Sequence, residues 1–341
     1  MIQSTLFFLF LAAAVQAQNF AIGYTEGAWN DPARNRDVDY VCWYPADAAG
    51  QDVAVAQGSF PVVVLAHGFL TGTAPYQNVA DSLVPLGYIL LLPATETGFT
   101  PSHAALGQDM VFLAERIQQA HGQSSSMWFG KVDPRMAAAG HSMGGGATYL
   151  ATSQPQQPFT CSFTFAAAET SPSSSQAAAQ VTIPSLLLAG SEDGVTPPAT
   201  TQQPIYNNLA GCKVMYSING GGHCYFMNPD PPCDFGELAT PPSLDRTSQQ
   251  IRAFRVLRPW LATWLKDSSG TAVEAVLNSP GTDAVQQNCN TLSTQNVGEV
   301  SEWLELRSNG FVWKKAGKYS LQCLDMNGRV VYATDTSAQL G

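Results

Sequence analysis

A serine set among glycines is the feature of this chain that most directly indicates chemistry. Residues 140–144 are Gly-His-Ser-Met-Gly and match the G-x-S-x-G pattern, and two more glycines follow. In this pattern a strand turns sharply into a helix and lifts the serine clear of the sheet, while small neighbours allow the bend and the approach of a substrate. An apolar run (136–140) precedes the motif, and a helix-compatible segment (146–152) follows it. We therefore predict that Ser142 is a nucleophile.

A serine hydroxyl needs a base that takes its proton, and the base needs an acid that orients it. Of the five histidines, only His223 follows Ser142 in the chain, and proteins with this serine turn have the order Ser, acid, His. His223 follows a strand-like run and a glycine-rich turn, so we predict that it is the base. The competing interpretations are a loop histidine and a metal ligand. Because no second histidine or carboxylate stands at zinc spacing, we expect no metal site.

Three acidic residues lie between Ser142 and His223: Glu169, Glu192 and Asp193. Asp193 ends a strand-and-turn segment, where the carboxyl edge of a sheet would place an orienting acid, and we predict it as the third catalytic residue. Glu192 is adjacent and would point the other way. Glu169 follows an earlier strand end and is the reserve candidate.

Acyl transfer also needs two backbone N–H groups aimed at the oxygen that becomes negative. The N–H of Met143, directly after the serine, is one expected donor. The other is the N–H of Phe69, in the His-Gly-Phe loop that follows the apolar run 62–66. The alternative for Phe69 is an ordinary core residue.

The segments around these residues alternate between strand-like and helix-like patterns. Apolar runs occur at 62–66, 88–92, 136–140, 161–167, 185–189 and 214–218. Helical faces are marked by Leu106, Met110, Leu113 and Ile117, and by Phe254, Leu257, Leu261 and Trp264. Short apolar strands that alternate with helices indicate an α/β fold with a mostly parallel sheet covered on both faces. Ligands bind at the carboxyl ends of such strands.

Only about fifteen residues separate the run 161–167 from Ile183, where a large lid is commonly inserted in such folds. We therefore expect no large lid and an open groove. Its expected lining is Phe69, Met143, Ala168, Val195, Tyr225 and Phe226.

The composition restricts the partners of the protein. The 341 residues include 45% hydrophobic and 12% charged residues, with 16 Lys and Arg against 26 Asp and Glu. A net charge of −10 without a basic stripe excludes nucleic acid as an expected partner and favours neutral or weakly polar substrates. We expect a monomer.

Export is predicted by the chain's beginning and its cysteines. Residues 1–17 combine an apolar run with small residues at a cleavage site after Ala17 and resemble a signal peptide. No later segment is long and apolar enough to span a membrane. Seven cysteines in an exported chain make disulfides plausible, and we predict a bridge between Cys224 and Cys233, with Cys161 as a buried thiol. The expected location is outside the cell or on its surface.

The pattern weakens near residue 267, so we expect a catalytic domain over 18–267 and a linker with a small β-rich module over 268–341. A hairpin is expected with strands at 321–324 and 329–332. The tail (316–332) resembles, in shortened form, the C-terminal β sorting modules of Bacteroidetes type IX secretion cargo.

Segments 67–69, 140–146, 189–196 and 220–223 together resemble the dienelactone-hydrolase and cutinase-type branch of the α/β-hydrolases, near bacterial polyester hydrolases and chlorophyllases. The resemblance covers roughly residues 35–266. It implies an α/β-hydrolase fold and a secreted serine esterase that forms an acyl-enzyme on Ser142, needs no cofactor and cleaves small or polymeric esters.

Two departures from these relatives bear on the substrate. Dienelactone hydrolases have a cysteine nucleophile, so Ser142 favours the esterase side. Polyester-cleaving cutinases have a Trp-His pair where this chain has Ala168 and Glu169, which counts against polyesters. The alternatives are a serine peptidase of the same fold and a non-catalytic surface binding protein on a hydrolase scaffold.

Overall fold

The computed structural model describes residues 19–289 and, further along the chain, the strand segments 304–307, 310–313, 317–324 and 330–338. The expected signal peptide lies outside the described residues. Among the described helices, none has the length and apolar character needed to cross a membrane.

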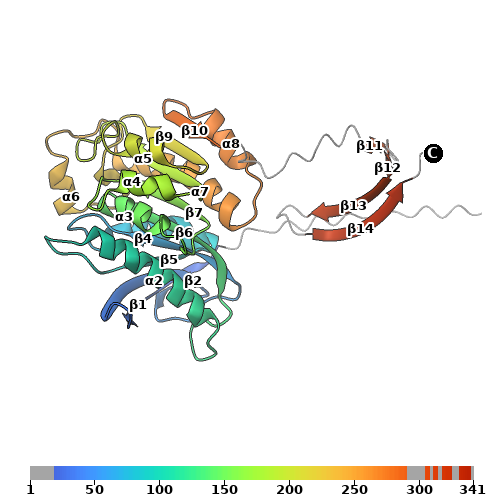
Figure 1. The fold of residues 1–341 in the computed structure, drawn as a ribbon, viewed down its shortest axis with the longest axis horizontal. Coiled ribbons are helices and arrows are strands. Elements are labelled where there is room, and N and C mark those ends of the chain that lie inside the picture. Colours follow the sequence, from blue (N-terminus) through green and yellow to red (C-terminus); the bar gives the residue numbers. More distant parts are fainter. Residues whose placement is uncertain (1–18, 290–303, 308–309, 314–316, 325–329, 339–341) are drawn as a thin grey trace, which may run out of the picture.

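A ten-stranded sheet in the order β10-β9-β8-β7-β6-β4-β5-β2-β1-β3 forms the centre of the domain (Figure 1). Its strands are β1 (Ala21–Asp31), β2 (Arg36–Ala46), β3 (Gly50–Gln51), β4 (Phe60–Ala66), β5 (Ile89–Pro93), β6 (Val132–His141), β7 (Cys161–Phe165), β8 (Ser185–Gly190), β9 (Lys213–Ile218) and β10 (Ala284–Asn288). The six strands β4 to β9 pair in parallel. Antiparallel pairs join β1 to β2, β2 to β5 and β9 to β10.

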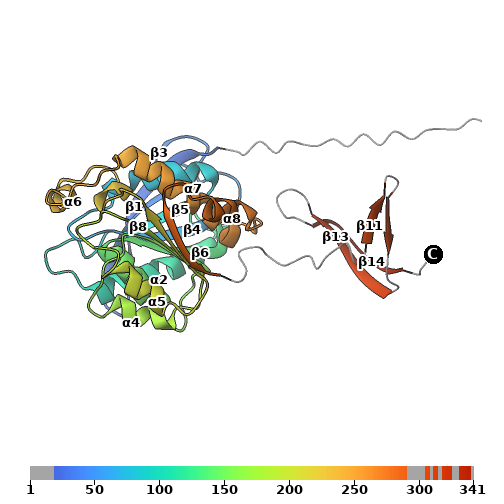
Figure 2. The same cartoon turned by 90° about the horizontal axis from the view of Figure 1, so that it is seen from above.

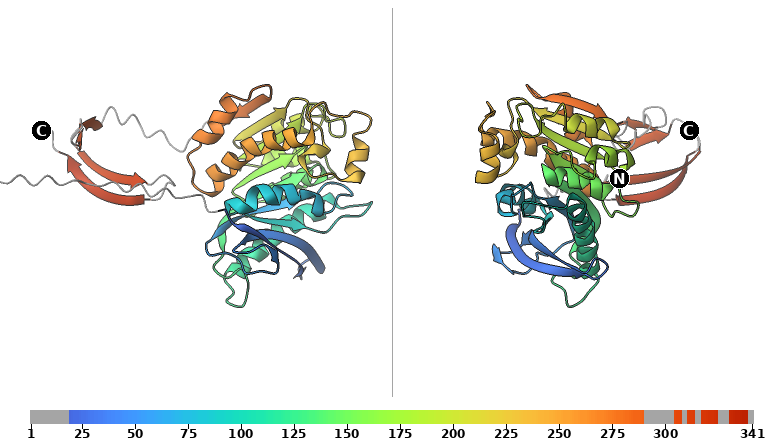
Figure 3. Two further views of the ribbon diagram at one scale, coloured as in Figure 1. Left: turned by 180° about the vertical axis from the view of Figure 1, so that it is seen from behind. Right: turned by 60° about the vertical axis from the view of Figure 1, so that its left-hand side comes forward.

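Helices cover both faces of this sheet. One face carries α2 (His103–His121), α3 (Met143–Thr152), α4 (Ser174–Ala177) and α5 (Gln202–Asn208), and the other carries α1 (Gln77–Leu83), α7 (Arg246–Leu265) and α8 (Thr271–Asn278) (Figures 1 and 3). Alternation along β4 feeds both cores, because Val63 and Leu65 pack with α1 and α7, whereas Val62 and Val64 pack with α2 and α3. The predicted α/β-hydrolase architecture is confirmed, including the two helices predicted from their apolar faces.

Short elements complete the described loops. They are the 3₁₀ turns η1 (Ala74–Tyr76), η2 (Val84–Leu86), η3 (Ala178–Gln180) and η4 (Cys224–Phe226), and the helix α6 (Pro231–Gly236). The connection between β7 and β8 holds only α4 and η3, so no large lid is inserted there. The protrusion that carries α6 follows β9 instead (Figure 2).

The sheet extends beyond the domain end that we expected at residue 267. Strand β10 pairs with β9, and Cys289, which follows it, forms a disulfide with Cys212. The sheet and the bridge therefore reach about twenty residues beyond the expected boundary, which the sequence pattern did not indicate. The reason is that β10 is an edge strand with mostly exposed residues and lacks the apolar run by which a buried strand is recognised.

Two antiparallel strand pairs occur in the C-terminal part of the chain. One joins β11 (Leu304–Arg307) to β12 (Gly310–Trp313), and the other joins β13 (Gly317–Leu324) to β14 (Val330–Ala338). The second pair includes the two expected hairpin strands and is longer than predicted. Its loop, 325–329, lies outside the described residues. The resemblance to a sorting module stays a prediction.

Candidate active site

Ser142 occupies the turn between β6 and α3 in a strained backbone conformation. Its φ is 54° and its ψ is −119°, which non-glycine residues rarely adopt. The turn requires glycine on either side: a Cβ on Gly140 would lie 2.1 Å from the carbonyl oxygen of Gly144, and one on Gly144 would lie 2.1 Å from that of Ala66. The strand-turn-helix expected from the serine motif is therefore present, with Ser142 at its tip.

His223 and Asp193 lie in direct contact on the loops that follow β9 and β8. His223 Nδ1 is 2.9 Å from Asp193 Oδ2, and both side chains are buried. The other carboxylate oxygen of Asp193 accepts the backbone N–H groups of Val195 at 2.9 Å and Thr196 at 2.7 Å. These bonds hold the carboxylate in one orientation, so it can hold the imidazole in turn.

The Ser142 elbow and the His223 loop are neighbours. The ring of His141, the residue before Ser142, lies 4.8 Å from the His223 ring, measured between centroids. The Ser142 hydroxyl makes no hydrogen bond with His223 or with any other described residue. Without substrate, such catalytic hydrogen bonds are often long or poorly aligned and tighten in the substrate complex.

The other two acidic candidates have different partners. Glu169 accepts hydrogen bonds from the Ser174 hydroxyl and the Ser175 N–H at the start of α4. Glu192 accepts the Ser243 N–H at 2.6 Å. Neither carboxylate contacts His223, so the geometry favours Asp193 as its acidic partner.

The backbone N–H groups of Phe69 and Met143, the two expected oxyanion donors, have no hydrogen-bond acceptor within the described residues. Met143 is the first residue of α3, where amides lack intrahelical partners and the helix dipole favours negative charge. In the other loop, the Gly68 N–H donates a hydrogen bond to Tyr76 Oη at 2.9 Å, and the N–H of Phe69 comes next in the chain. The Phe69 side chain is 47% exposed, so this residue is not part of the core.

The expected groove lining needs a correction. Phe69 and Val195 are exposed, and Ala168 and Tyr225 are partly exposed. Phe226, however, is only 1% exposed and stacks on Phe165 at 5.2 Å within the core, so it offers no surface to a substrate. The Met143 side chain is also buried in the core next to the sheet, which leaves only its amide as a candidate contact.

Three polar residues that the sequence did not indicate hold the loops that carry Asp193 and His223. Thr196 Oγ1 lies 2.8 Å from Asp193 Oδ2 and 2.9 Å from His223 Nδ1. Glu237 accepts the backbone N–H of His223, and burial raises the pKa of its carboxyl. Gln249, on α7, exchanges two hydrogen bonds with the backbone of Gly222. No periodic pattern marks such residues.

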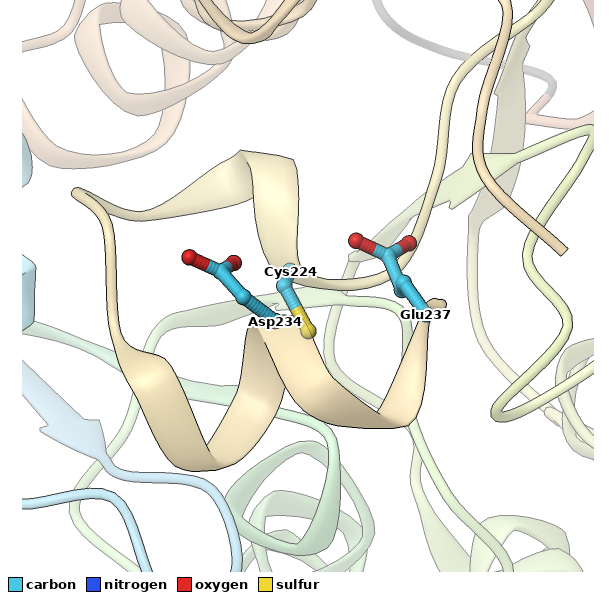
Figure 4. Close-up of side chains that lie close together, drawn as sticks. All are labelled: Cys224, Asp234 and Glu237. Carbon is cyan, nitrogen blue, oxygen red and sulfur yellow. The ribbon is translucent and has the colours of Figure 1, made fainter. Parts of the chain in front are cut away.

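A cluster of possible metal-binding groups lies beside His223 and is formed by Cys224, Asp234 and Glu237 (Figure 4). Its sulfur is not a free thiolate, because Cys224 forms a disulfide with Cys233. A metal ion would therefore lack the thiolate ligand that this cluster needs.

The disulfide between Cys224 and Cys233 confirms the predicted pair, and Cys161 is buried and free as expected.

A mostly parallel sheet with a strained serine between β6 and α3, beside a histidine–aspartate pair, defines an α/β-hydrolase. A family model described as PET hydrolase-like matches residues 41–232, more than half of the chain, and the protein belongs to this family. The resemblance to cutinase-type and polyester hydrolases is thereby confirmed, and it indicates an ester hydrolase. A comparison with curated proteins finds no match.

Proposed function

We propose that the protein hydrolyses carboxylic esters through an acyl-enzyme on Ser142, with His223 as the base and Asp193 as the residue that orients it. The observation that carries the proposal is the 2.9 Å contact between His223 Nδ1 and Asp193 Oδ2 beside the Ser142 elbow. Glu169 and Glu192, the other acids considered, are engaged elsewhere.

The proposed reaction begins with a proton transfer. With its Nδ1–H donated to Asp193, His223 has Nε2 as an acceptor for the Ser142 proton while the serine oxygen attacks the ester carbonyl. The N–H groups of Phe69 and Met143 stabilise the oxyanion. His223 then protonates the leaving alcohol, and a water molecule hydrolyses the acyl-enzyme by the same steps in reverse order.

The surroundings of Ser142 support a neutral ester as substrate. Phe69 and Val195 expose apolar surface, and the segment between β7 and β8 holds no large lid. The net charge of −10 disfavours anionic substrates. Family membership supports polyesters among the candidates, and Ala168 and Glu169 are the positions at which this chain departs from polyester-cleaving cutinases.

The first test is loss of reactivity in Ser142→Ala. A fluorophosphonate probe should label the wild type and not the variant, and turnover of p-nitrophenyl esters should fall by roughly 10⁵- to 10⁶-fold. Ser153→Ala, which removes a hydroxyl from the other end of α3, is the matched control and should keep full activity. Labelling that persists in Ser142→Ala would show that another residue is the nucleophile. An amide panel run in parallel separates an esterase from a peptidase.

The acid assignment is tested by two isosteric changes. Asp193→Asn should lower kcat by about 10⁴-fold, because the amide cannot hold the required imidazole tautomer. Glu169→Gln should leave kcat within about twofold. The reverse result would assign the role to Glu169.

Export is proposed on independent grounds. Two disulfides, Cys212–Cys289 and Cys224–Cys233, are typical of proteins that fold in an oxidising compartment. Mass spectrometry of the protein recovered from culture medium should find a mature chain that begins at Gln18. An intact Met1 in the recovered protein would refute the signal peptide.

A further inference from the structure

A series of buried hydrogen bonds runs beneath the site from the Phe69 loop to the His223 loop. The Gly68 N–H donates to Tyr76 Oη at 2.9 Å. Tyr76 Oη in turn lies 2.9 Å from His141 Nδ1. His141 Nε2 lies 3.0 Å from the carbonyl oxygen of His223. Tyr76 and His141 are essentially inaccessible to solvent.

The direction of each hydrogen bond follows from the chemistry of the groups. Burial, together with the neighbouring His223, lowers the pKa of His141 well below its usual value, so its ring is neutral, with one donor and one acceptor nitrogen. Because a carbonyl only accepts, Nε2 must carry the proton. Nδ1 is then the acceptor, and the Tyr76 hydroxyl must donate to it. The Tyr76 oxygen remains free to accept the Gly68 N–H.

This arrangement connects the two loops on which the proposed chemistry depends. The bond to the Gly68 N–H fixes the residue before Phe69, whose own N–H has no acceptor within the described residues. At the other end, His141 binds the His223 carbonyl while Glu237 binds the His223 N–H, so the peptide groups on both sides of the imidazole are held. A shift at either end would leave buried polar groups unpaired, which is costly.

We propose that Tyr76 and His141 are positioning residues, which through these hydrogen bonds hold the Phe69 amide and the His223 imidazole in their working positions relative to each other. The inference rests on the proposed ester hydrolysis. Both side chains act through Gly68 and His223.

The test is Tyr76→Phe, which keeps the ring and removes the hydroxyl that Gly68 and His141 share. We expect kcat for a p-nitrophenyl ester to fall about 10- to 100-fold, because the oxyanion donor and the base lose their relative position, while KM stays within about twofold. Affinity for a trifluoromethyl ketone, which forms a tetrahedral adduct with the serine, should fall by a similar factor, because it depends on the same groups.

Tyr149→Phe is the matched control. Tyr149 is also fully buried, and its hydroxyl lies 3.2 Å from Thr164 Oγ1, outside the series of hydrogen bonds described above. The control should lose a comparable amount of thermal stability while kcat and ketone affinity stay within about twofold of wild type. If Tyr76→Phe loses no more kcat than Tyr149→Phe for the same concentration of folded protein, the role of Tyr76 is purely structural and the inference is wrong.

A second variant covers the case in which Tyr76→Phe does not fold. His141→Gln keeps an N–H for the His223 carbonyl but removes the ring nitrogen that accepts the Tyr76 hydroxyl, and it should also lower kcat with KM nearly unchanged. An unchanged kcat would contradict the inference. A wild type that neither reacts with a fluorophosphonate nor turns over esters would refute the proposed function itself, whereas an active wild type with fully active variants refutes only the positioning role.

Discussion

Glu237 illustrates how a single buried carboxyl controls the backbone next to His223. It accepts the N–H group of His223, and only 3% of its surface is exposed. Burial disfavours its charged form and raises its pKa above the usual value of 4.5. The folded protein therefore binds this proton more tightly than the unfolded chain, and the free energy of unfolding decreases as pH rises from 4.5 through the raised pKa.

The prediction at this scale concerns Glu237→Gln. Because glutamine does not titrate, the variant should gain stability relative to wild type as pH rises from 4.5 through the raised pKa of Glu237. The difference should be largest at neutral pH. The measurement is the difference in Tm between variant and wild type from pH 4 to pH 8. A difference independent of pH would contradict the prediction.

Glu169→Gln is a control of opposite sign. Burial opposes ionisation of Glu169, but hydrogen bonds from Ser173, Ser174 and Ser175 outweigh it and lower its pKa. Its carboxylate therefore stabilises the folded state above its unfolded pKa, and this contribution is lost as pH falls through the lowered value. The glutamine variant should accordingly lose stability relative to wild type as pH rises.

At the scale of elements, buried ion pairs attach the β1–β2 turn to α2. Asp109, on α2, is fully buried and lies 2.7 Å from Arg34 Nη1 and 2.8 Å from Arg36 Nη2. Arg36 also pairs with Glu96 at 2.7 Å. These contacts hold two strands of the sheet edge against the helix that covers it.

Asp109→Ala should reduce the free energy of unfolding by about 3–5 kcal/mol, because it leaves two partly buried guanidinium groups without their shared carboxylate. Asp81→Ala is the control: its carboxylate accepts an exposed hydrogen bond from Gln77, and the change should stay within about 0.5 kcal/mol. Urea unfolding of the three proteins measures both values. Equal losses in the two variants would show that the ion pairs do not stabilise the contact.

At the scale of the whole molecule, the described sheet and its packing extend to β10 and Cys289. Strand β10 extends the sheet, α8 contributes Val273 and Leu277 to the core, and the Cys212–Cys289 bridge closes a sequence separation of 77 residues. In the chain-entropy account, a bridge of that length stabilises a fold by about 4 kcal/mol. We therefore propose that the catalytic unit runs from Gln18 to Cys289.

Two truncations test this boundary. A chain that ends at residue 289 should keep the Tm and the ester turnover of the full-length protein. A chain that ends at residue 267 should unfold at a much lower temperature or fail to fold, because it loses α8, β10 and the bridge. If the two truncated chains are equally stable, the result would support a catalytic domain that ends at residue 267.

Some features of this protein were determined by its sequence alone. Glycines at 140 and 144 permit a strained serine turn whose geometry depends on adjacent residues, and such local constraints are visible in a sequence. The same holds for apolar runs that become buried parallel strands. Ser142 and His223 could be nominated because the chain offers few histidines and one suitable serine motif, and the choice among three acids followed from their positions relative to strand ends.

Other features were decided only by the tertiary structure. Tyr76, Thr196 and Glu237 act through hydrogen bonds to residues on other loops, and a lone polar residue carries no periodic signal of its partner. The burial of Phe226 depends on the direction of the short turn η4, and the place of β10 depends on pairing with β9 rather than on its own apolar residues. Hydrogen bonds and edge pairing require a partner's position in space, which local sequence patterns do not encode.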